Sequence, residues 1–340
     1  MRILDKDYDM NEVIRYTGGA DNLNSVDILK FEGGKAGGSR QIRVNTCNGL
    51  SVVLLPDRGL DIAEIYYKGV KVSFISKNGI TGQNAVNPHE TEFLNYFAGG
   101  MLTTCGLRNA GPACREESSE YHPLHGRYNT IPAQETGIYR PDQETIEVTG
   151  TVKETALFGY NLKMHRCIRV NSKDSSIDIE DTLTNDSPEA QEIMLLYHYN
   201  FGFPFIQDGC RVEFEEDDDV IPRDKEAEKG MDSYSELTTP KDGYAEQVFF
   251  HRQKGDNEGF GTVKVINPHL GLSAELKYDT SVLPVLVHWK CMRSTDYALG
   301  LEPANCYVKG RTDERKNNTL KIIQPFDKMI FKTSLEFKKD

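Results

Sequence analysis

The sequence has no long apolar run and no closely spaced cysteines. None of its segments reaches the roughly 18 apolar residues that a membrane-spanning helix needs. Its seven cysteines are scattered, odd in number and without a C-x-x-C pair. This distribution argues against a disulfide framework or a structural zinc site and favours a reducing compartment. The first seven residues also lack a continuous apolar stretch, so we expect no signal peptide and a cytoplasmic protein.

The chain also lacks an excess of basic residues. Its formal net charge is -12, whereas binding to nucleic acid depends on neutralising phosphates with lysine and arginine. We therefore expect no nucleic-acid partner and no attachment to an anionic membrane. The sequence has no phosphate-binding glycine loop, dinucleotide fingerprint, nucleophile elbow or metalloprotease helix. We therefore expect neither a cofactor nor a metal.

What the sequence does contain is a series of short segments in which apolar and polar residues alternate. Residues 176–183 alternate in this way, and so do residues 262–266 and 272–278, which flank a turn-forming stretch at 267–271. Period-two alternation is typical of strands, and two such runs around a turn predict a β-hairpin. Further strands are predicted at residues 51–55, 61–67, 145–154, 162–170, 192–199, 282–292, 297–301, 319–325 and 331–337.

Helical periodicity is scarce. Residues 91–102 and 245–252 are the two places where a short helix is expected. Many strands and few helices predict an all-β protein built as a large antiparallel β-sandwich or barrel. Because no linker interrupts the pattern, we expect residues 1–340 to form a single domain, with residues 1–40 wrapping the edge of the sandwich.

Four segments interrupt the alternation with polar residues that a plain core does not need. The first contains Asp57-Arg58-Gly59, where Arg58 either closes a salt-bridged turn or points into a polar cleft. The second contains His125-Gly126-Arg127. In an extended segment His125 and Arg127 share a face, which suits the oxygens of a hydroxylated ligand. The alternatives are two loop histidines, His122 and His125, that cap turns or bind a metal.

The third and fourth segments carry the candidate catalytic groups. His198 follows an apolar run and lies among aromatic residues, which favours either a hydrogen-bonded core histidine or a polar group in a sugar-stacking cleft. Glu302 ends an apolar strand directly before a proline, so we expect a partly buried carboxylate with a raised pKa. Trp289, the only tryptophan, precedes it by one strand and either floors the same cleft or packs in the core.

Taken in order, the runs TCGL, PLHGR, LLYHYNFGFP and LGLEPAN resemble the aldose 1-epimerase (galactose mutarotase) superfamily, and most closely its DUF4432 branch. The resemblance covers residues 50–335 and implies a galactose mutarotase-like β-supersandwich. It also implies roles for three residues: His125 binds substrate, His198 is the general acid and Glu302 is the general base. Arg58, Arg127, Asn200 and Trp289 are expected to bind the sugar with His125, but no residue matches the sugar-binding aspartate of mutarotases.

These expectations describe a protein that binds a free sugar, as a monomer or homodimer. It is expected to interconvert the anomers of that sugar by ring opening, as an isomerase of the mutarotase type. The expectation places His198 and Glu302 across a cleft a few ångströms wider than a pyranose ring. Two alternatives stay open: a non-catalytic carbohydrate-binding or regulatory protein, and a lyase or epimerase for an acidic sugar that uses Arg58, Arg108 or Lys290. The identity of the sugar is also open.

Overall fold

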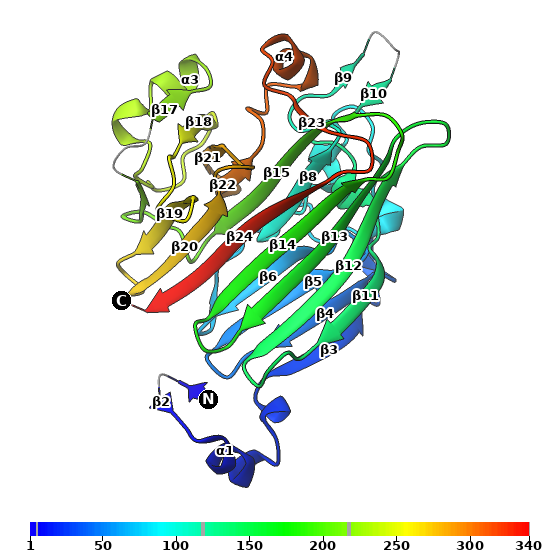
Figure 1. The fold of residues 1–340 in the computed structure, drawn as a ribbon. Coiled ribbons are helices and arrows are strands. Elements are labelled where there is room, and N and C mark those ends of the chain that lie inside the picture. The colour runs from blue at the N-terminus through cyan, green and yellow to red at the C-terminus, as the bar shows by residue number, and fades with distance from the viewer. Residues whose placement is uncertain (5, 117–119, 216–218, 340) are drawn as a thin grey trace.

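Two antiparallel sheets form the body of the protein (Figure 1). The computed structural model describes residues 1–4, 6–116, 120–215 and 219–339. All pairings between the named strands of this part are antiparallel, in agreement with the all-β sandwich that the sequence predicts. None of its helices has the length and apolar character needed to cross a bilayer.

The smaller sheet has eight strands and the larger sheet has twelve. In spatial order, the smaller sheet contains β11 (Gln134–Tyr139), β12 (Thr145–Thr155), β13 (Asn161–Asn171), β14 (Ser176–Asn185), β24 (Lys328–Lys339), β20 (Leu272–Asp279), β19 (Phe260–Asn267) and β16 (Arg211–Phe214). The larger sheet contains β17 (Asp219–Pro222), β18 (Gln247–Arg252), β21 (Val285–Arg293), β22 (Asp296–Ala304), β15 (Gln191–Gly202), β8 (Leu102–Leu107), β6 (Asp61–Tyr67), β5 (Leu50–Leu55), β4 (Arg40–Asn45) and β3 (Ser25–Lys30), with β7 (Val70–Lys71) beside β6 and β23 (Lys321–Ile323) beside β15.

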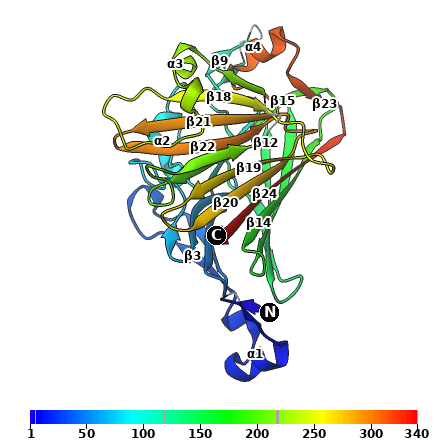
Figure 2. The ribbon, with the colours of Figure 1, turned by 90° about the vertical axis from the view of Figure 1, so that its left-hand side faces the viewer.

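The remaining elements are short. Two small hairpins are formed by β1 (Arg2–Ile3) with β2 (Lys6–Asp7) and by β9 (Cys114–Arg115) with β10 (Tyr121–His122). The described α-helices are α1 (Met10–Thr17), α2 (Phe93–Tyr96), α3 (Lys225–Glu228) and α4 (Arg311–Lys316). Strand β3 is the edge of the larger sheet, and the unit containing β1, β2 and α1 hangs below the sandwich (Figures 1 and 2).

The alternation in the sequence corresponds to alternating burial. In β14, Ile177, Ile179 and Leu183 enter the core while Asp178 and Glu180 point outward. The predicted hairpin forms between β19 and β20, where Asn267 accepts hydrogen bonds from the backbone of two turn residues. In the strands that alternate regularly, one face of the sheet is buried and the other is exposed to solvent.

One predicted helix is wrong. The segment 245–252 contains β18, which pairs with β17 and β21. Its Phe249 and Phe250 are both fully buried although they point to opposite faces. A strand that is covered on both faces does not alternate between apolar and polar residues. The apolar residues of β18 therefore have a spacing that resembles that of a helix.

A buried charge network lies in the core between the sheets. Arg166 on β13 has no exposed surface, and its guanidinium donates to Asp61 on β6 (2.7 Å) and to Asp181 on β14 (2.7 Å). The hydroxyl of Tyr197 on β15 donates to the same Asp181 carboxylate (2.6 Å). The network therefore joins both sheets directly behind the strand that carries His198.

Candidate functional site

His198 and Glu302 lie on neighbouring strands and face the outer side of the larger sheet. The antiparallel register of β15 and β22 pairs Tyr199 with Leu301, which places residue 198 opposite residue 302 on one face. His198 Nε2 is 3.3 Å from Glu302 Oε1. The expected wide cleft between them is therefore wrong, because side chains at opposite positions of adjacent strands are close neighbours and leave no room for a sugar ring.

Gly300 provides the space for the Glu302 carboxylate. Residues 300 and 302 point to the same side of β22, and 300 also pairs with Trp289 on β21. A Cβ at position 300 would overlap with Oε1 of Glu302 and would lie 3.0 Å from Cβ of Trp289. The lack of a side chain at residue 300 therefore allows the carboxylate and the indole to lie on either side of it.

This arrangement predicts the effect of Gly300→Ala. The methyl group should push the Glu302 carboxylate away from His198, so a reaction that needs both groups should slow by at least about 10-fold, because displacements of about 1 Å have large kinetic effects. Gly33→Ala is the control for added side-chain volume, because residue 33 is exposed, has an extended φ of -149° and has no atom within 4 Å of the added methyl position. A Gly300→Ala protein with wild-type kinetics would contradict the packing argument.

The pair is almost completely buried, which sets its protonation. His198 is 7% exposed and Glu302 is 3% exposed. Burial, with the nearby His125, lowers the pKa of His198 from its ordinary 6.5 to about 3, against a small opposing effect of Asn200. Burial, with the charge of Glu246, raises the pKa of Glu302 well above 4.5, and Arg223 opposes this. Both shifts favour the uncharged forms, a carboxylic acid beside a neutral imidazole.

Three buried polar atoms of the described residues at the pair form no hydrogen bond. Among the described residues, His198 Nδ1, Glu302 Oε1 and Asn200 Oδ1 are buried and accept or donate no hydrogen bond. The Asn200 amide nitrogen donates to the carbonyl oxygens of Gly100 (3.0 Å) and His198 (2.7 Å). Asn200 therefore fixes the backbone of β15 next to the pair. Buried polar atoms without a hydrogen bond are uncommon in folded proteins, and these three are available to hydrogen-bond a ligand or a water molecule.

Aromatic rings surround His198 on its exposed side. The ring centroids of Phe97, Trp289 and His125 are 5.4, 5.5 and 6.0 Å from that of His198. Phe93 on α2 packs against His125 at 4.8 Å. The structure thus brings His125, His198, Glu302 and Trp289 together, and Trp289 and Phe97 are half-buried at the rim of this group. Burial lowers the pKa of His125 to about 4, so this imidazole is neutral as well.

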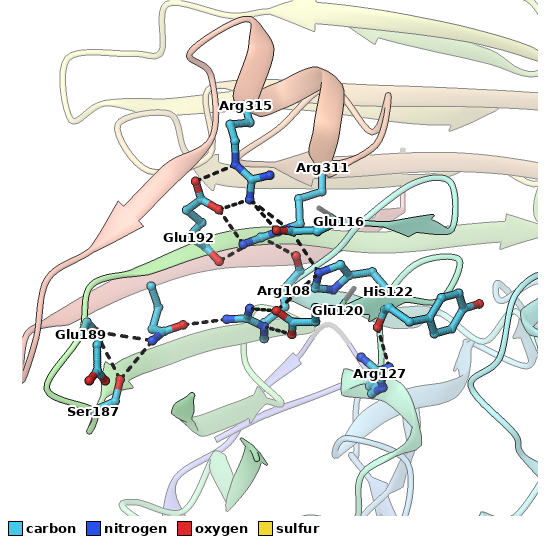
Figure 3. A network of polar contacts seen from close by, with 12 residues as sticks. Arg108, Glu116, Glu120, His122, Arg127, Ser187, Glu189, Glu192, Arg311 and Arg315 are labelled. Carbon is cyan, nitrogen blue, oxygen red and sulfur yellow. Dashed lines mark hydrogen bonds and ion pairs between the residues drawn. The ribbon is translucent and has the colours of Figure 1, made fainter. Parts of the chain in front are cut away.

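Arg127 lies elsewhere, and the expectation that it shares a face with His125 is wrong. The segment is a turn: His125 and Gly126 have φ angles of +59° and +74°. Arg127 donates from Nη2 to the carbonyl oxygen of Tyr121 (2.8 Å) and lines a separate surface groove of about 380 Å³ with Glu120 and Tyr160. Figure 3 shows Arg127 near the second polar network of the protein.

That second network contains His122 and Arg108 (Figure 3). His122 Nε2 is 3.1 Å from Glu116 Oε1, which also pairs with Arg311. Arg108 donates to Glu120 (2.8 Å) and to the side-chain oxygen of Gln191 (2.7 Å). The described residues include no cluster of three His, Cys, Asp or Glu side chains arranged to hold a metal ion.

The other two basic candidates are also held away from the pair. Arg58 is buried and donates to the carbonyl oxygens of Thr81 (2.7 Å) and Asn129 (2.6 Å), so it joins two loops. It does not pair with Asp57, whose partner is Arg40 (2.6 Å). Lys290 donates to the carbonyl oxygen of Ser233 (2.7 Å) from the opposite face of β21.

Residues 36–337 match the model of a family described as a domain of unknown function, DUF4432. The chain belongs to this family. No curated protein matches the sequence.

Solved structures similar to this DUF4432 chain include three bacterial proteins. A protein of Klebsiella pneumoniae subsp. pneumoniae MGH 78578, provisionally described as an aldose 1-epimerase, is 25% identical, with a TM-score of 0.87 over 93% of this chain and 84% of that chain. A galactose mutarotase-like protein of Clostridium acetobutylicum is 14% identical (TM-score 0.62, 93% and 99% covered). A galactose 1-epimerase of Lactobacillus acidophilus NCFM is also 14% identical (TM-score 0.58, 93% and 99% covered). The last two show the shared fold.

Several residues of the DUF4432 site were not predicted from the sequence. Phe93 and Phe97 have the i, i+4 spacing of one helical face, and this spacing was the available signal for the aromatic wall. Glu246 and Arg223 lie in connections next to β18 and β17 and have no sequence pattern that marks them. Asp181 is buried in the network of Arg166, so it is not available to bind a sugar in this site.

Proposed function

We propose that the protein is an isomerase of the aldose 1-epimerase type, which opens and recloses the ring of a free sugar at the His198–Glu302 pair. The observation that carries this proposal is the direct contact of a carboxyl and an imidazole group, 3.3 Å apart, beside an indole ring. The similarity to solved proteins described as aldose and galactose 1-epimerases supports the same chemistry.

The short distance suits a reaction at a single carbon. The hydroxyl oxygen and the ring oxygen of a cyclic aldose are both bonded to the anomeric carbon, so two neighbouring side chains reach both oxygens from one side. Glu302 takes the proton of the anomeric hydroxyl while His198 gives a proton to the ring oxygen, and the bond between that oxygen and the anomeric carbon breaks. Rotation of the free carbonyl and reversal of both transfers close the ring as the other anomer.

The number and position of the protons on the pair fit this cycle. In the free protein the proton is favoured on Glu302 over His198, because burial favours two neutral groups over an ion pair. Oε1 and Nε2 are 3.3 Å apart, so a small side-chain movement on sugar binding forms the hydrogen bond through which the proton moves to His198. Carboxyl and imidazole then return to their starting states after each reaction, and no proton has to be exchanged with the solvent.

The pKa shifts predict an unusual pH dependence. The active pair holds one proton, so activity falls at low pH only when His198 takes a second proton, at a pKa of about 3. No fall of the anomer exchange rate constant toward acid is therefore expected between about pH 7 and 5, as long as the protein is folded. An acid limb with a midpoint near the ordinary histidine value, about 6.5, would show that His198 is solvated during the reaction.

Trp289 offers a direct test of binding because it is the only tryptophan in the chain. His198 and Glu302 are nearly covered and have Trp289 and Phe97 at their rim, so a sugar that reaches the pair has to contact Trp289. We expect saturable changes in tryptophan emission when pentoses, hexoses, deoxysugars and uronic acids are titrated, with at least one sugar binding. An open-chain sugar alcohol is the control for viscosity and refractive effects. Unchanged emission with every cyclic sugar would overturn the proposal, whereas binding without anomer exchange would indicate a non-catalytic sugar-binding protein.

A further inference from the structure

Three residues form a hydrogen-bonded chain at the rim of the site. The indole Nε1 of Trp289 donates to Glu246 Oε2 (2.8 Å), and Arg223 Nη2 donates to Glu246 Oε1 (3.0 Å). Arg223 is fixed in turn by a bond from Nε to Asp224 Oδ2 (2.9 Å) and by its backbone nitrogen, which donates to the carbonyl oxygen of Val248 (2.9 Å). Both oxygens of the Glu246 carboxylate are therefore used to hold groups at the rim.

The orientation of the indole depends on this chain. Trp289 meets His198 edge-on (5.5 Å between centroids, 79° between planes) and Phe74 in a similar way (6.5 Å, 73°). On the β22 side its neighbour is Gly300, which has no side chain to restrict the ring. Nε1 is the one polar atom of an indole, and its bond to Glu246 fixes the direction in which this N–H points.

We propose that Glu246 is a positioning residue of the site, which holds the indole of Trp289 as the platform for the apolar C–H face of the sugar ring and is itself held by Arg223. The part of this inference that concerns the sugar rests on the proposed function, whereas the orientation of the indole does not. An indole platform favours cyclic sugars that present several C–H bonds on one face, since such a face packs on an aromatic ring and excludes water.

The charge of Glu246 acts on the same site. The groups that face Glu302 are His198 on β15, Cys105 on β8 and, at the rim, Glu246 and Arg223. The negative charge of Glu246 raises the pKa of Glu302, and the positive charge of Arg223 lowers it. Loss of the Glu246 charge should therefore lower the pKa at which the pair loses its proton, and the alkaline limb of activity should move to lower pH.

The test compares Glu246→Gln with Glu246→Ala, because the amide oxygen of glutamine still accepts a hydrogen bond whereas alanine has no acceptor. We expect Glu246→Ala to shift the Trp289 emission to longer wavelength, increase its quenching by acrylamide and weaken sugar binding about 10-fold, the loss expected for a hydrogen bond to a charged group. Glu246→Gln should keep wild-type emission and quenching, while the alkaline limb moves to lower pH in both variants. Glu258→Gln, an exposed residue, is the control for surface charge.

The fluorescence result decides the inference without any sugar present. If emission and quenching in Glu246→Ala equal those of the wild type, or if both Glu246 variants change equally, Glu246 does not position the indole through its acceptor and the inference is overturned. If the variants differ as expected but no sugar binds or reacts, the positioning role stands and the proposed function fails.

Discussion

Replacement of Glu302 by glutamine is expected to slow anomer exchange by about 100- to 10,000-fold, the usual contribution of a general acid–base group. Glutamine has nearly the same shape and fits the space above Gly300, but it neither takes the proton of the anomeric hydroxyl nor passes one to His198. The sugar should still change the emission of Trp289, because the aromatic rim is unchanged. Exchange spectroscopy of the anomeric protons measures the rate, and fluorescence measures the binding.

Glu180→Gln is the matched control for this substitution. Glu180 lies on the solvent side of β14 in the other sheet, 3.5 Å from Lys332, and its loss should leave the exchange rate unchanged. The double variant His198→Asn with Glu302→Gln should be about as slow as the worse single variant, because the two groups act as a unit. Full activity in Glu302→Gln would remove Glu302 from the chemistry.

Replacement of Arg166 by methionine is expected to lower the free energy of unfolding by about 3–5 kcal/mol, the typical effect of removing one partner of a buried ion pair. Arg166 is fully buried and binds Asp61 and Asp181, and methionine would leave both carboxylates without their cation. Urea unfolding followed by circular dichroism measures the change.

The pH dependence of this variant follows from Asp61. Burial raises the pKa of Asp61 even in the wild type, against the effect of Arg166. Without Arg166 the pKa of Asp61 in the folded chain should rise further above its value in the unfolded chain. Stability then rises as the pH falls through the raised pKa of Asp61, so the deficit of the variant should shrink as the pH is lowered from neutral.

Arg169→Met is the control on the same strand. Arg169 pairs with Glu147 (2.8 Å) on the surface, where a salt bridge contributes about 0–1 kcal/mol. A loss for Arg166→Met no larger than that for Arg169→Met would show that the buried network does not stabilise the sandwich.

The strands that were predicted well are those with one buried and one solvated face. β14, β19 and β20 alternate in the sequence because they alternate in burial. β18 was predicted as a helix because both of its faces are covered, and the twelve-stranded arrangement of the larger sheet depends on pairings between distant segments that no local pattern specifies.

The sequence predicted only part of the candidate site. The structure brings His125, His198, Glu302 and Trp289 together from four separate segments. The predicted position of Arg127 was wrong because the left-handed backbone of His125 and Gly126 turns the chain. Residues other than glycine seldom adopt this conformation, so the sequence around His125 does not predict it. The pairing of β17 with β18 and of β18 with β21 brings Glu246 and Arg223 to the site. No local pattern in the sequence predicts this pairing.

Exchange NMR of the anomeric protons of free sugars, with and without the wild-type protein, tests the central claim most directly. If His198 and Glu302 act as proposed, at least one sugar that perturbs Trp289 will exchange its α and β anomers faster in the presence of the protein, in proportion to protein concentration. If every sugar that binds at Trp289 exchanges only at its spontaneous rate, the pair is not an anomerisation catalyst and the proposed function is wrong.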